Sequence, residues 1–372
     1  METRQINLAL QGGGAHGAFT WGVLDRLLDE DWIEIAGITG TSAGALNGAA
    51  LKAGLAKGAG HAGRQAAREN LDYVWGRVGQ VSESRLARWF FPMLPVPAPM
   101  QRMAELFSPA AWVEGMTRLF SPYDYGPFYR NPLKSIVDDL PYDGINARRG
   151  PLLFISATNV RTGRIRVFSE KEVTPDVILA SACLPTLFRA IEFKDPATGQ
   201  IEAYWDGGYT GNPALFPLYD ADLPGDIVVV NINPMSRDAI PKSPAAIADR
   251  INEISFNSSL LRELRALQFM KGMIAQGKIK DMTLKAINLH MIMDDALMND
   301  LSARSKILPG PGMLGRMKAA GQDAADRWLS ECSSCIGVRD SYDLEPIFGP
   351  AIRPSVRAAE KAAEKAAELA GA

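Results

Sequence analysis

Residues 6–55 repeat one pattern, in which a short apolar run leads through a glycine-containing turn into a segment with helical spacing. The runs 6–10 and 33–39 are bounded by turn residues, as buried strands are. Residues 19–28 place apolar side chains on one helical face, and residues 45–55 favour a second helix. Strand–helix–strand–helix in this order predicts a parallel sheet covered by helices.

Residues 152–232 return to the same pattern, with strand-like runs on both sides of a short helix at 177–183. Residues 247–279 then favour a long helix with several isoleucines on one face, and residues 287–293 alternate as an edge strand does. We therefore predict a three-layer α/β/α sandwich with a mostly parallel central sheet, a helical insertion and a helical C-terminal region.

The charge balance narrows the class of protein. The chain has 40 Lys and Arg against 42 Asp and Glu, a formal net charge of −2, whereas nucleic-acid-binding proteins normally carry a basic excess. We expect no nucleic-acid partner. The first residues do not match a secretory signal, and no run approaches the ~18 apolar residues of a membrane span. We expect a cytoplasmic protein.

The three cysteines do not suggest a disulfide framework, because an odd number cannot pair completely. Cys332 and Cys335 form a lone CxxC with no second pair to complete a zinc site. We interpret both as ordinary thiols in a loop, and we expect neither a metal nor a cofactor.

A G-x-S-x-G sequence links the second predicted strand to the helix after it, and consists of Gly40, Thr41, Ser42, Ala43 and Gly44. A nucleophilic serine has to stand on a sharp, strained turn, and the two glycines leave room for that turn. The helix that follows adds the positive end of its dipole. The pentapeptide alone often occurs by chance, but its strand–turn–helix position makes Ser42 our candidate nucleophile.

A second glycine turn follows the first predicted strand, and consists of Gly12, Gly13, Gly14, Ala15, His16 and Gly17. Successive glycines can point backbone amides into one cavity, where they stabilise the oxyanion of acyl transfer. The turn also matches G-x-G-x-x-G through Gly12, Gly14 and Gly17, with Glu34 as a candidate acidic residue, so a dinucleotide-binding protein stays open. The G-x-S-x-G turn after the next strand, the nucleophile elbow around Ser42, favours a hydrolase.

A serine hydroxyl needs a neighbouring group that accepts its proton. Of the three histidines, His16 lies in the glycine turn and His61 in an Ala/Gly-rich stretch. His290 would complete the order Ser42, Asp206, His290 of an α/β-hydrolase triad. His290 lies in a strand-like run, however, where we expect a histidine to be exposed or half-buried.

Asp206 is the preferred base. It follows the predicted strand 201–205 and precedes Gly207 and Gly208, so its carboxylate would stand on a turn at a strand end. In open α/β sheets, sites gather beyond the carboxyl ends of the strands.

Three motifs in this order resemble the patatin-like phospholipase family: the glycine-rich segment 12–17, the G-x-S-x-G of 40–44 and the Asp-Gly-Gly of 206–208. The block 180–188 and the pair Asn212-Pro213 are also similar to that family. The combination covers roughly residues 6–235 and is far more specific than any single motif.

The resemblance implies a Ser–Asp dyad without a histidine, acting on a lipid or another acyl ester. Ser42 would attack the ester carbonyl, Asp206 would take its proton and then activate water, and the amides of residues 12–15 would hold the oxyanion. The family usually has Arg or Lys where this chain has His16, which we expect to be only partly charged near neutral pH. A non-catalytic lipid-binding member of the same fold is the alternative.

We expect residues 1–240 to form the patatin-like catalytic α/β domain, with residues 57–130 as an insertion of short helices and irregular, proline-rich segments. Residues 241–350 would form a C-terminal helical extension with one late strand packed on the domain. Residues 351–372 are built almost wholly of Ala, Glu and Lys, and predict a solvated helical tail.

Residues 86–113 gather apolar side chains, among them Trp89, Phe90 and Phe91. Two interpretations stay open: the buried core of a cap, or a lid that touches a membrane surface with nearby arginines on anionic head groups. The second would make the protein peripherally membrane-associated.

Overall fold

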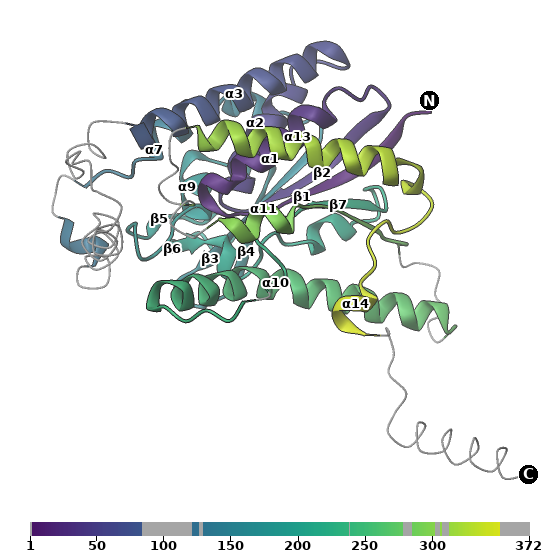
Figure 1. The fold of residues 1–372 in the computed structure, drawn as a ribbon. Helices are drawn as coiled ribbons and strands as arrows, with labels where there is room; N and C mark the ends of the chain where they lie inside the picture. The colour runs from purple at the N-terminus through teal and green to yellow at the C-terminus, as the bar shows by residue number, and fades with distance from the viewer. Residues whose placement is uncertain are drawn as a thin grey trace, which may run out of the picture.

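The computed structural model describes residues 2–83, 121–125, 129–237, 239–277, 285–301, 306 and 312–349. An eight-stranded sheet lies at the centre, in the order β5-β6-β3-β2-β1-β7-β8 with β4 paired to β3 (Figure 1). The strands are β1 (Arg4–Leu10), β2 (Ile33–Gly40), β3 (Leu152–Asn159), β4 (Ile165–Ser169), β5 (Ile191–Lys194), β6 (Ile201–Asp206), β7 (Asp226–Val230) and β8 (Asn288–Ile292).

The main helices alternate with these strands along the chain. They are α1 (Gly17–Leu27), α2 (Ala43–Leu55), α3 (His61–Glu83), α7 (Lys134–Asp138), α8 (Tyr142–Ile145), α9 (Pro175–Ser181), α10 (Pro244–Ala275), α11 (Asp295–Asp300), α13 (Met313–Cys332) and α14 (Glu345–Phe348). Short 3₁₀ turns join them, including η1 (Gly14–His16), η5 (Gly207–Tyr209) and η7 (Ser333–Cys335).

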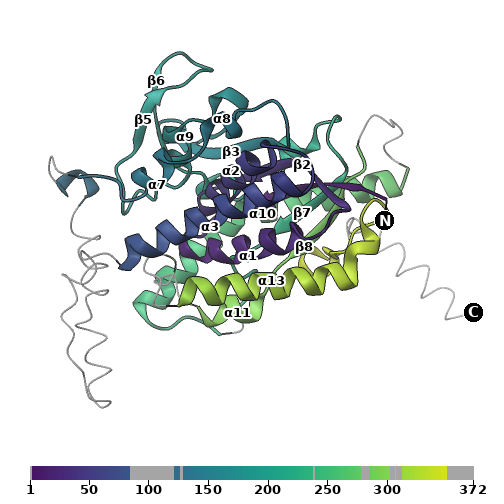
Figure 2. The same cartoon turned by 90° about the horizontal axis from the view of Figure 1, so that it is seen from above.

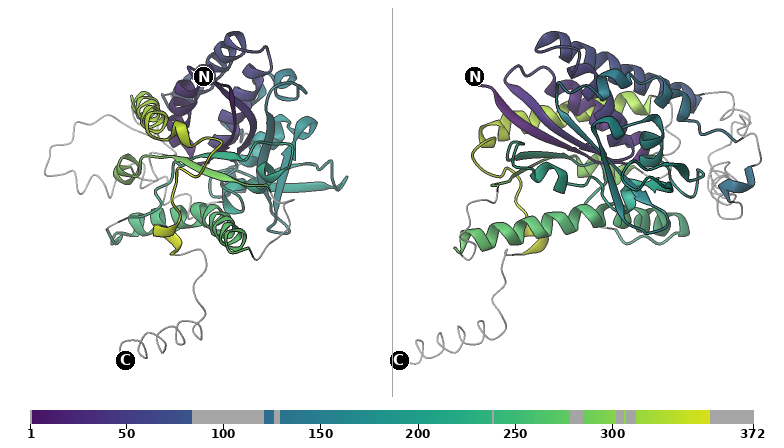
Figure 3. Two further views of the ribbon diagram at one scale, coloured as in Figure 1. Left: turned by 90° about the vertical axis from the view of Figure 1, so that its right-hand side faces the viewer. Right: turned by 180° about the vertical axis from the view of Figure 1, so that it is seen from behind.

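Five strands are parallel: β3, β2, β1, β7 and β8 pair in that order, whereas β4, β5 and β6 pair antiparallel at one side. Helices lie on both faces, with α1, α3 and α13 running side by side over one face (Figure 2) and α10 under the other (Figure 3). The predicted three-layer sandwich with a mostly parallel sheet is confirmed.

The alternation of side chains along the strands explains the two helical layers, because successive residues of a strand point to opposite faces. In β7, Val228 and Val230 belong to the apolar cluster that contains α1, α2, α3 and α13. Ile227 and Val229 belong to a second cluster with Leu260, Leu264 and Leu267 of α10.

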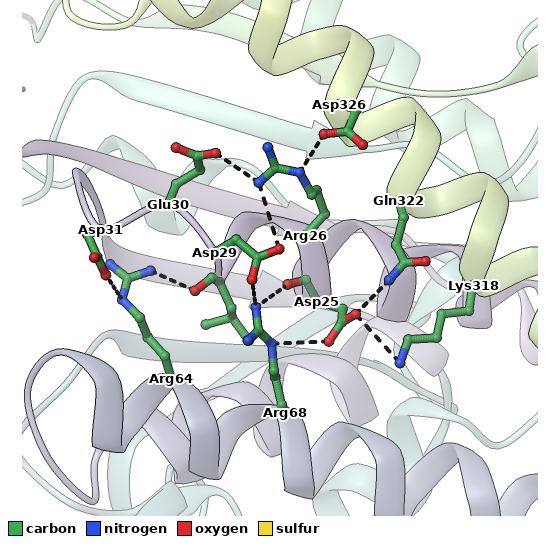
Figure 4. A network of polar contacts seen from close by, with 11 residues as sticks. Asp25, Arg26, Asp29, Glu30, Asp31, Arg64, Arg68, Lys318, Gln322 and Asp326 are labelled. Carbon is green, nitrogen blue, oxygen red and sulfur yellow. Dashed lines mark hydrogen bonds and ion pairs between the residues drawn. The ribbon is translucent and has the colours of Figure 1, made fainter.

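The C-terminal part of the chain completes this architecture. Strand β8 pairs with β7 and so extends the central sheet itself. Helix α13 lies against α1 with backbones almost touching, since a Cβ at Gly22 would lie 1.9 Å from the carbonyl oxygen of Lys318. A polar network then ties α1 and α13 to α3 (Figure 4).

One local prediction was wrong. Residues 61–83 form one 23-residue helix, α3, rather than short helices, and its Leu71, Val74 and Trp75 are buried in the core. The prolines that suggested irregular structure come only after residue 91, so their signal does not extend back to α3.

The predicted long helix is present as α10, and its isoleucines are exposed to solvent. Ile247, Ile251 and Ile254 are 43%, 58% and 54% exposed, because this half of α10 turns polar residues such as Glu253 and Asn257 inward.

The segments 86–113 and 351–372 lie outside the described residues, and the domain limits stay a prediction. Among the described residues, no helix is both long and apolar enough to span a bilayer.

Candidate active site

Ser42 stands on a strained turn between β2 and α2. Its backbone has φ 55° and ψ −119°, a left-handed conformation that non-glycine residues seldom adopt. Strain of this kind persists only where the surrounding structure imposes it, and it clusters at functional sites. A Cβ on Gly12 would lie 2.7 Å from the Cβ of Ser42, so the glycine turn after β1 is in direct contact with this elbow.

The sheet register brings Asp206 to the same level as Ser42. Gly40, two residues before Ser42, pairs with Ile155 of β3. Asp206 pairs with Ala157, two residues after Ile155. Strand β6 is antiparallel to β3, so it runs in the opposite direction to the five parallel strands.

Asp206 is fully buried and only partly satisfied. Its Oδ1 accepts a hydrogen bond from the Gly208 amide at 2.7 Å, whereas its Oδ2 has no well-formed hydrogen bond from the described residues. Burial raises the pKa of Asp206 to about 7, against the opposing effects of the Gly208 amide and the Ser42 hydroxyl.

The hydroxyl of Ser42 is therefore close enough to favour the charged carboxylate, although an aligned hydrogen bond to Oδ2 is not formed. Such contacts are often long in a free enzyme and tighten when substrate binds. The amide of Ser42 donates to the hydroxyl of Ser181 at 2.9 Å, which fixes the elbow from α9.

The glycine turn runs from Gly12 and Gly13 through η1 into α1, which begins at Gly17. The amide of Gly12 donates to Oδ1 of Asn212 at 2.7 Å. The amides of Gly13 and Gly14 donate to no acceptor among the described residues, as is usual for the first amides of a helical turn. Two amides without an acceptor among the described residues thus come directly after Gly12, which contacts the serine elbow.

Three residues that the sequence reasoning did not assign to the site hold this turn in place: Gln11, Asn212 and Asn233. All three are fully buried. The side-chain amide of Asn233 donates to the Gly12 carbonyl at 2.8 Å, and Oε1 of Gln11 accepts from the backbone amide of Asn233 at 2.9 Å. The position of Asn233 just beyond β7, at the carboxyl edge of the sheet, was a usable signal.

His16 is buried and neutral. Burial, followed by the nearby charge of Lys306, lowers the pKa of His16 to about 3. The expectation of a partly charged histidine near neutral pH was therefore wrong. The sequence did not reveal the burial of His16 or the nearby Lys306, which lies 290 positions away in the chain.

His290 is not brought to Ser42. It is fully buried, which corrects the expectation of an exposed or half-buried side chain. Its Nδ1 lies 2.8 Å from the hydroxyl of Ser341, and its Nε2 lies 3.0 Å from Oδ1 of Asp226. His61 begins α3 and is exposed.

Glu34 does not support a dinucleotide site. It is the second residue of β2 and pairs with Gln5 near the start of β1, at the opposite edge of the sheet from the glycine turn. Its carboxylate accepts a hydrogen bond from Gln5.

Cys332 ends α13 and Cys335 lies in η7, both as free thiols, so they lie at a helix end rather than in a loop. Among the described residues, no three His, Cys, Asp or Glu side chains are grouped so that they could hold a metal ion.

Comparisons with known proteins identify the family of the chain. A family model described as patatin-like phospholipase matches residues 8–221, which is more than half of the chain. Among solved structures, the crystal structure of VipD from Legionella pneumophila is similar over 89% of this chain and 67% of that chain, with 15% identity and a TM-score of 0.38. No curated protein sequence matches significantly. The chain belongs to the patatin-like phospholipase family and is a lipid acyl hydrolase.

Proposed function

We propose that the protein hydrolyses carboxylic esters of lipids through an acyl-enzyme on Ser42, with Asp206 as the general base. The observation that carries this proposal is the pairing of a strained serine with a buried, under-satisfied carboxylate on the same edge of the sheet. Burial of the carboxylate makes it a stronger base than an exposed aspartate.

In the first step, the Ser42 hydroxyl attacks the ester carbonyl and its proton passes to Asp206. The tetrahedral oxyanion would accept hydrogen bonds from the amides of Gly13 and Gly14, which have no described acceptor in the free protein. Collapse of this intermediate breaks the ester bond. The alcohol leaves with the proton that Asp206 returns, and the acyl group stays on Ser42.

In the second step, Asp206 takes a proton from water as that water attacks the acyl-enzyme. The fatty acid is released and Ser42 recovers its proton from Asp206. A pKa of about 7 suits a group that both accepts and returns a proton near neutral pH.

Fluorophosphonate labelling followed by intact-protein mass measurement tests the proposal. We expect one adduct on the wild-type protein and none on Ser42→Ala, together with loss of ester turnover in Ser42→Ala. His290→Ala is the matched control, because His290 lies against Asp226 and Ser341 rather than Ser42. A labelled or active Ser42→Ala protein would show that the nucleophile is elsewhere, and a wild-type protein that binds lipid vesicles without any turnover would support the non-catalytic alternative.

A further inference from the structure

We propose that Asn233 and Lys306 are positioning residues, which orient the Gly12–Gly13 peptide and strengthen the Gly13 amide as an oxyanion donor. This inference rests on the proposed function of the glycine turn. It assigns the positive charge beside that turn to a lysine from the C-terminal part of the chain.

The argument begins with a continuous chain of hydrogen bonds. The ammonium group of Lys306 donates to Oδ1 of Asn233 at 2.5 Å. The Nδ2 group of the same Asn233 donates to the carbonyl oxygen of Gly12 at 2.8 Å. Asn212 Nδ2 adds a longer hydrogen bond to that carbonyl, at 3.3 Å.

The direction of the Gly13 amide follows from the carbonyl before it. In a planar trans peptide, the C=O and the N–H point in opposite directions. Since Asn233 and Asn212 hold the Gly12 carbonyl on their side, the Gly13 N–H is turned away from both asparagines. It has no acceptor among the described residues, and its peptide adjoins Gly12, which contacts Ser42.

The lysine charge reaches this amide through two polarised amide groups. Hydrogen bonds in a chain strengthen one another, and charge-assisted bonds are stronger than neutral ones. A cation on Oδ1 of Asn233 makes its Nδ2 a better donor, and a bonded Gly12 carbonyl makes the Gly13 N–H a better donor in turn. The carbonyl oxygen of Lys306 also packs where a Cβ on Gly14 would stand, at 2.3 Å, so this residue limits the backbone of the turn as well.

The groups that face Lys306 come from three parts of the fold. Glu253 and Asp249 of α10 favour its charged form, whereas Arg237 disfavours it, and burial has the largest effect. Together they lower the pKa of Lys306 to about 8. The fourth group is His16, which is neutral. Of the two cations, Lys306 and Arg237, Lys306 is the one that donates to Asn233.

The test measures kcat and KM for a soluble ester over a range of pH, using the full-length protein. We expect Lys306→Met to lower kcat about tenfold with KM little changed, since weakening one donor costs less than the roughly 10²–10³ of removing one. In the wild type, kcat should fall as pH rises through about 8, where Lys306 loses its proton. Lys306→Arg should keep most of kcat and remove that fall, because arginine stays charged.

Two further variants separate this effect from general damage. Asn233→Asp keeps a partner for Lys306 but cannot donate to the Gly12 carbonyl, so kcat should fall although the lysine is intact. Lys52→Met is the matched control: burial also lowers the pKa of Lys52 to about 8, but its ammonium group donates to the carbonyls of Ala147 and Arg149. Lys52→Met should keep kcat and the alkaline fall.

Thermal unfolding of each variant shows whether it is folded. A folded Lys306→Met protein with wild-type kcat, or an alkaline fall that persists in Lys306→Arg, would overturn the inference while the proposed function stands. A wild-type protein with no Ser42-dependent ester turnover would overturn the proposed function first, and the two results cannot be confused.

Discussion

Two buried aspartates lie at opposite ends of the strands of the central sheet, Asp206 near the carboxyl ends of the parallel strands and Asp226 at their amino ends. Asp206 ends β6 and accepts one well-formed hydrogen bond from the described residues, at Oδ1. Asp226 begins β7, and its Oδ1 accepts hydrogen bonds from Nε2 of His290, Nδ2 of Asn288 and the Gly337 amide, at 3.0, 3.2 and 2.7 Å.

The pKa values of the two carboxyl groups are shifted in opposite directions. Burial raises the pKa of Asp206 to about 7. Burial acts in the same sense on Asp226, but hydrogen bonds from His290, Gly337 and Asn288 outweigh it and hold its pKa below the usual value. Burial alone therefore does not decide whether a carboxylate is structural or catalytic. The number of donors decides which one results, because donors stabilise only the charged form.

Replacing Asp206 by Asn should produce the largest effect on activity. The amide cannot accept the proton of Ser42, so ester turnover should fall by about 10³-fold, within the range for loss of general acid–base catalysis. The same change on the other aspartate, Asp226→Asn, should leave turnover per folded molecule near the wild-type value. Equal losses in the two variants would show that the contrast is not functional.

The pH dependence of stability should differ in sign between the two sites. The folded-state pKa of Asp206 is raised, so between about pH 4 and pH 7 the unfolded chain ionises first, and the free energy of unfolding falls as pH rises. The fall should amount to a few kcal/mol in total, because a tenfold difference in proton affinity between the folded and unfolded chains corresponds to ~1.4 kcal/mol. Asp206→Asn should remove this fall, and urea unfolding across this range measures it.

Asp226 should show the reverse behaviour. Its folded-state pKa is lowered, so the stability that it contributes is present above its ordinary value of 3.8 and is lost as pH falls through the acid range below that value. A wild-type protein whose unfolding free energy is flat from neutral to acid pH would contradict both assignments.

At neutral pH, Asp226→Asn should destabilise the protein by about 2 kcal/mol, because hydrogen bonds to a charged group are worth ~1.5–3 kcal/mol. Asp206→Asn should be neutral or stabilising, since it removes a buried charge with few partners. The identical substitution then has opposite consequences at the two edges, and urea unfolding at one pH is enough to compare them. Destabilisation by Asp206→Asn as large as that by Asp226→Asn would break the comparison.

The sequence showed one of these two sites far more clearly than the other. Ser42 and Asp206 stand in local motifs, with glycines that a sharp turn requires, so a few adjacent residues carry the signal. The parallel core of the sheet was readable for the same reason, because strand–helix alternation is local. The antiparallel direction of β6 depends on pairing with β3, which no local pattern reveals.

His290 illustrates the limit of prediction from sequence spacing. A serine, an aspartate and this histidine occur in the order of a hydrolase triad, but the aspartate beside His290 is Asp226 and the serine is Ser341. Pairing of β7 with β8 brings these side chains together, and register follows from packing across the sheet rather than from spacing in the chain. The contact between Asn233 and Lys306 was missed for the same reason, since 73 residues separate them.

The smallest predicted effect concerns a third kind of carboxylate, in the network over α1, α3 and α13 (Figure 4). Arg68 of α3 pairs with Asp25 of α1 and with Asp29, which follows that helix, while Asp25 also contacts Lys318 and accepts a hydrogen bond from Gln322 of α13. These groups reach solvent, and such ion pairs are usually worth less than about 1 kcal/mol. Arg68→Met should therefore lower the unfolding free energy by less than Asp226→Asn does.

Salt separates the two cases further. Screening weakens exposed ion pairs much more than buried ones. The difference in unfolding free energy between wild type and Arg68→Met should therefore shrink as salt is added, whereas the difference between wild type and Asp226→Asn should persist. Urea unfolding at low and high salt measures both. If Arg68→Met instead matched Asp226→Asn in size and in salt independence, solvent contact would not be what distinguishes the helical network from the buried edge of the sheet.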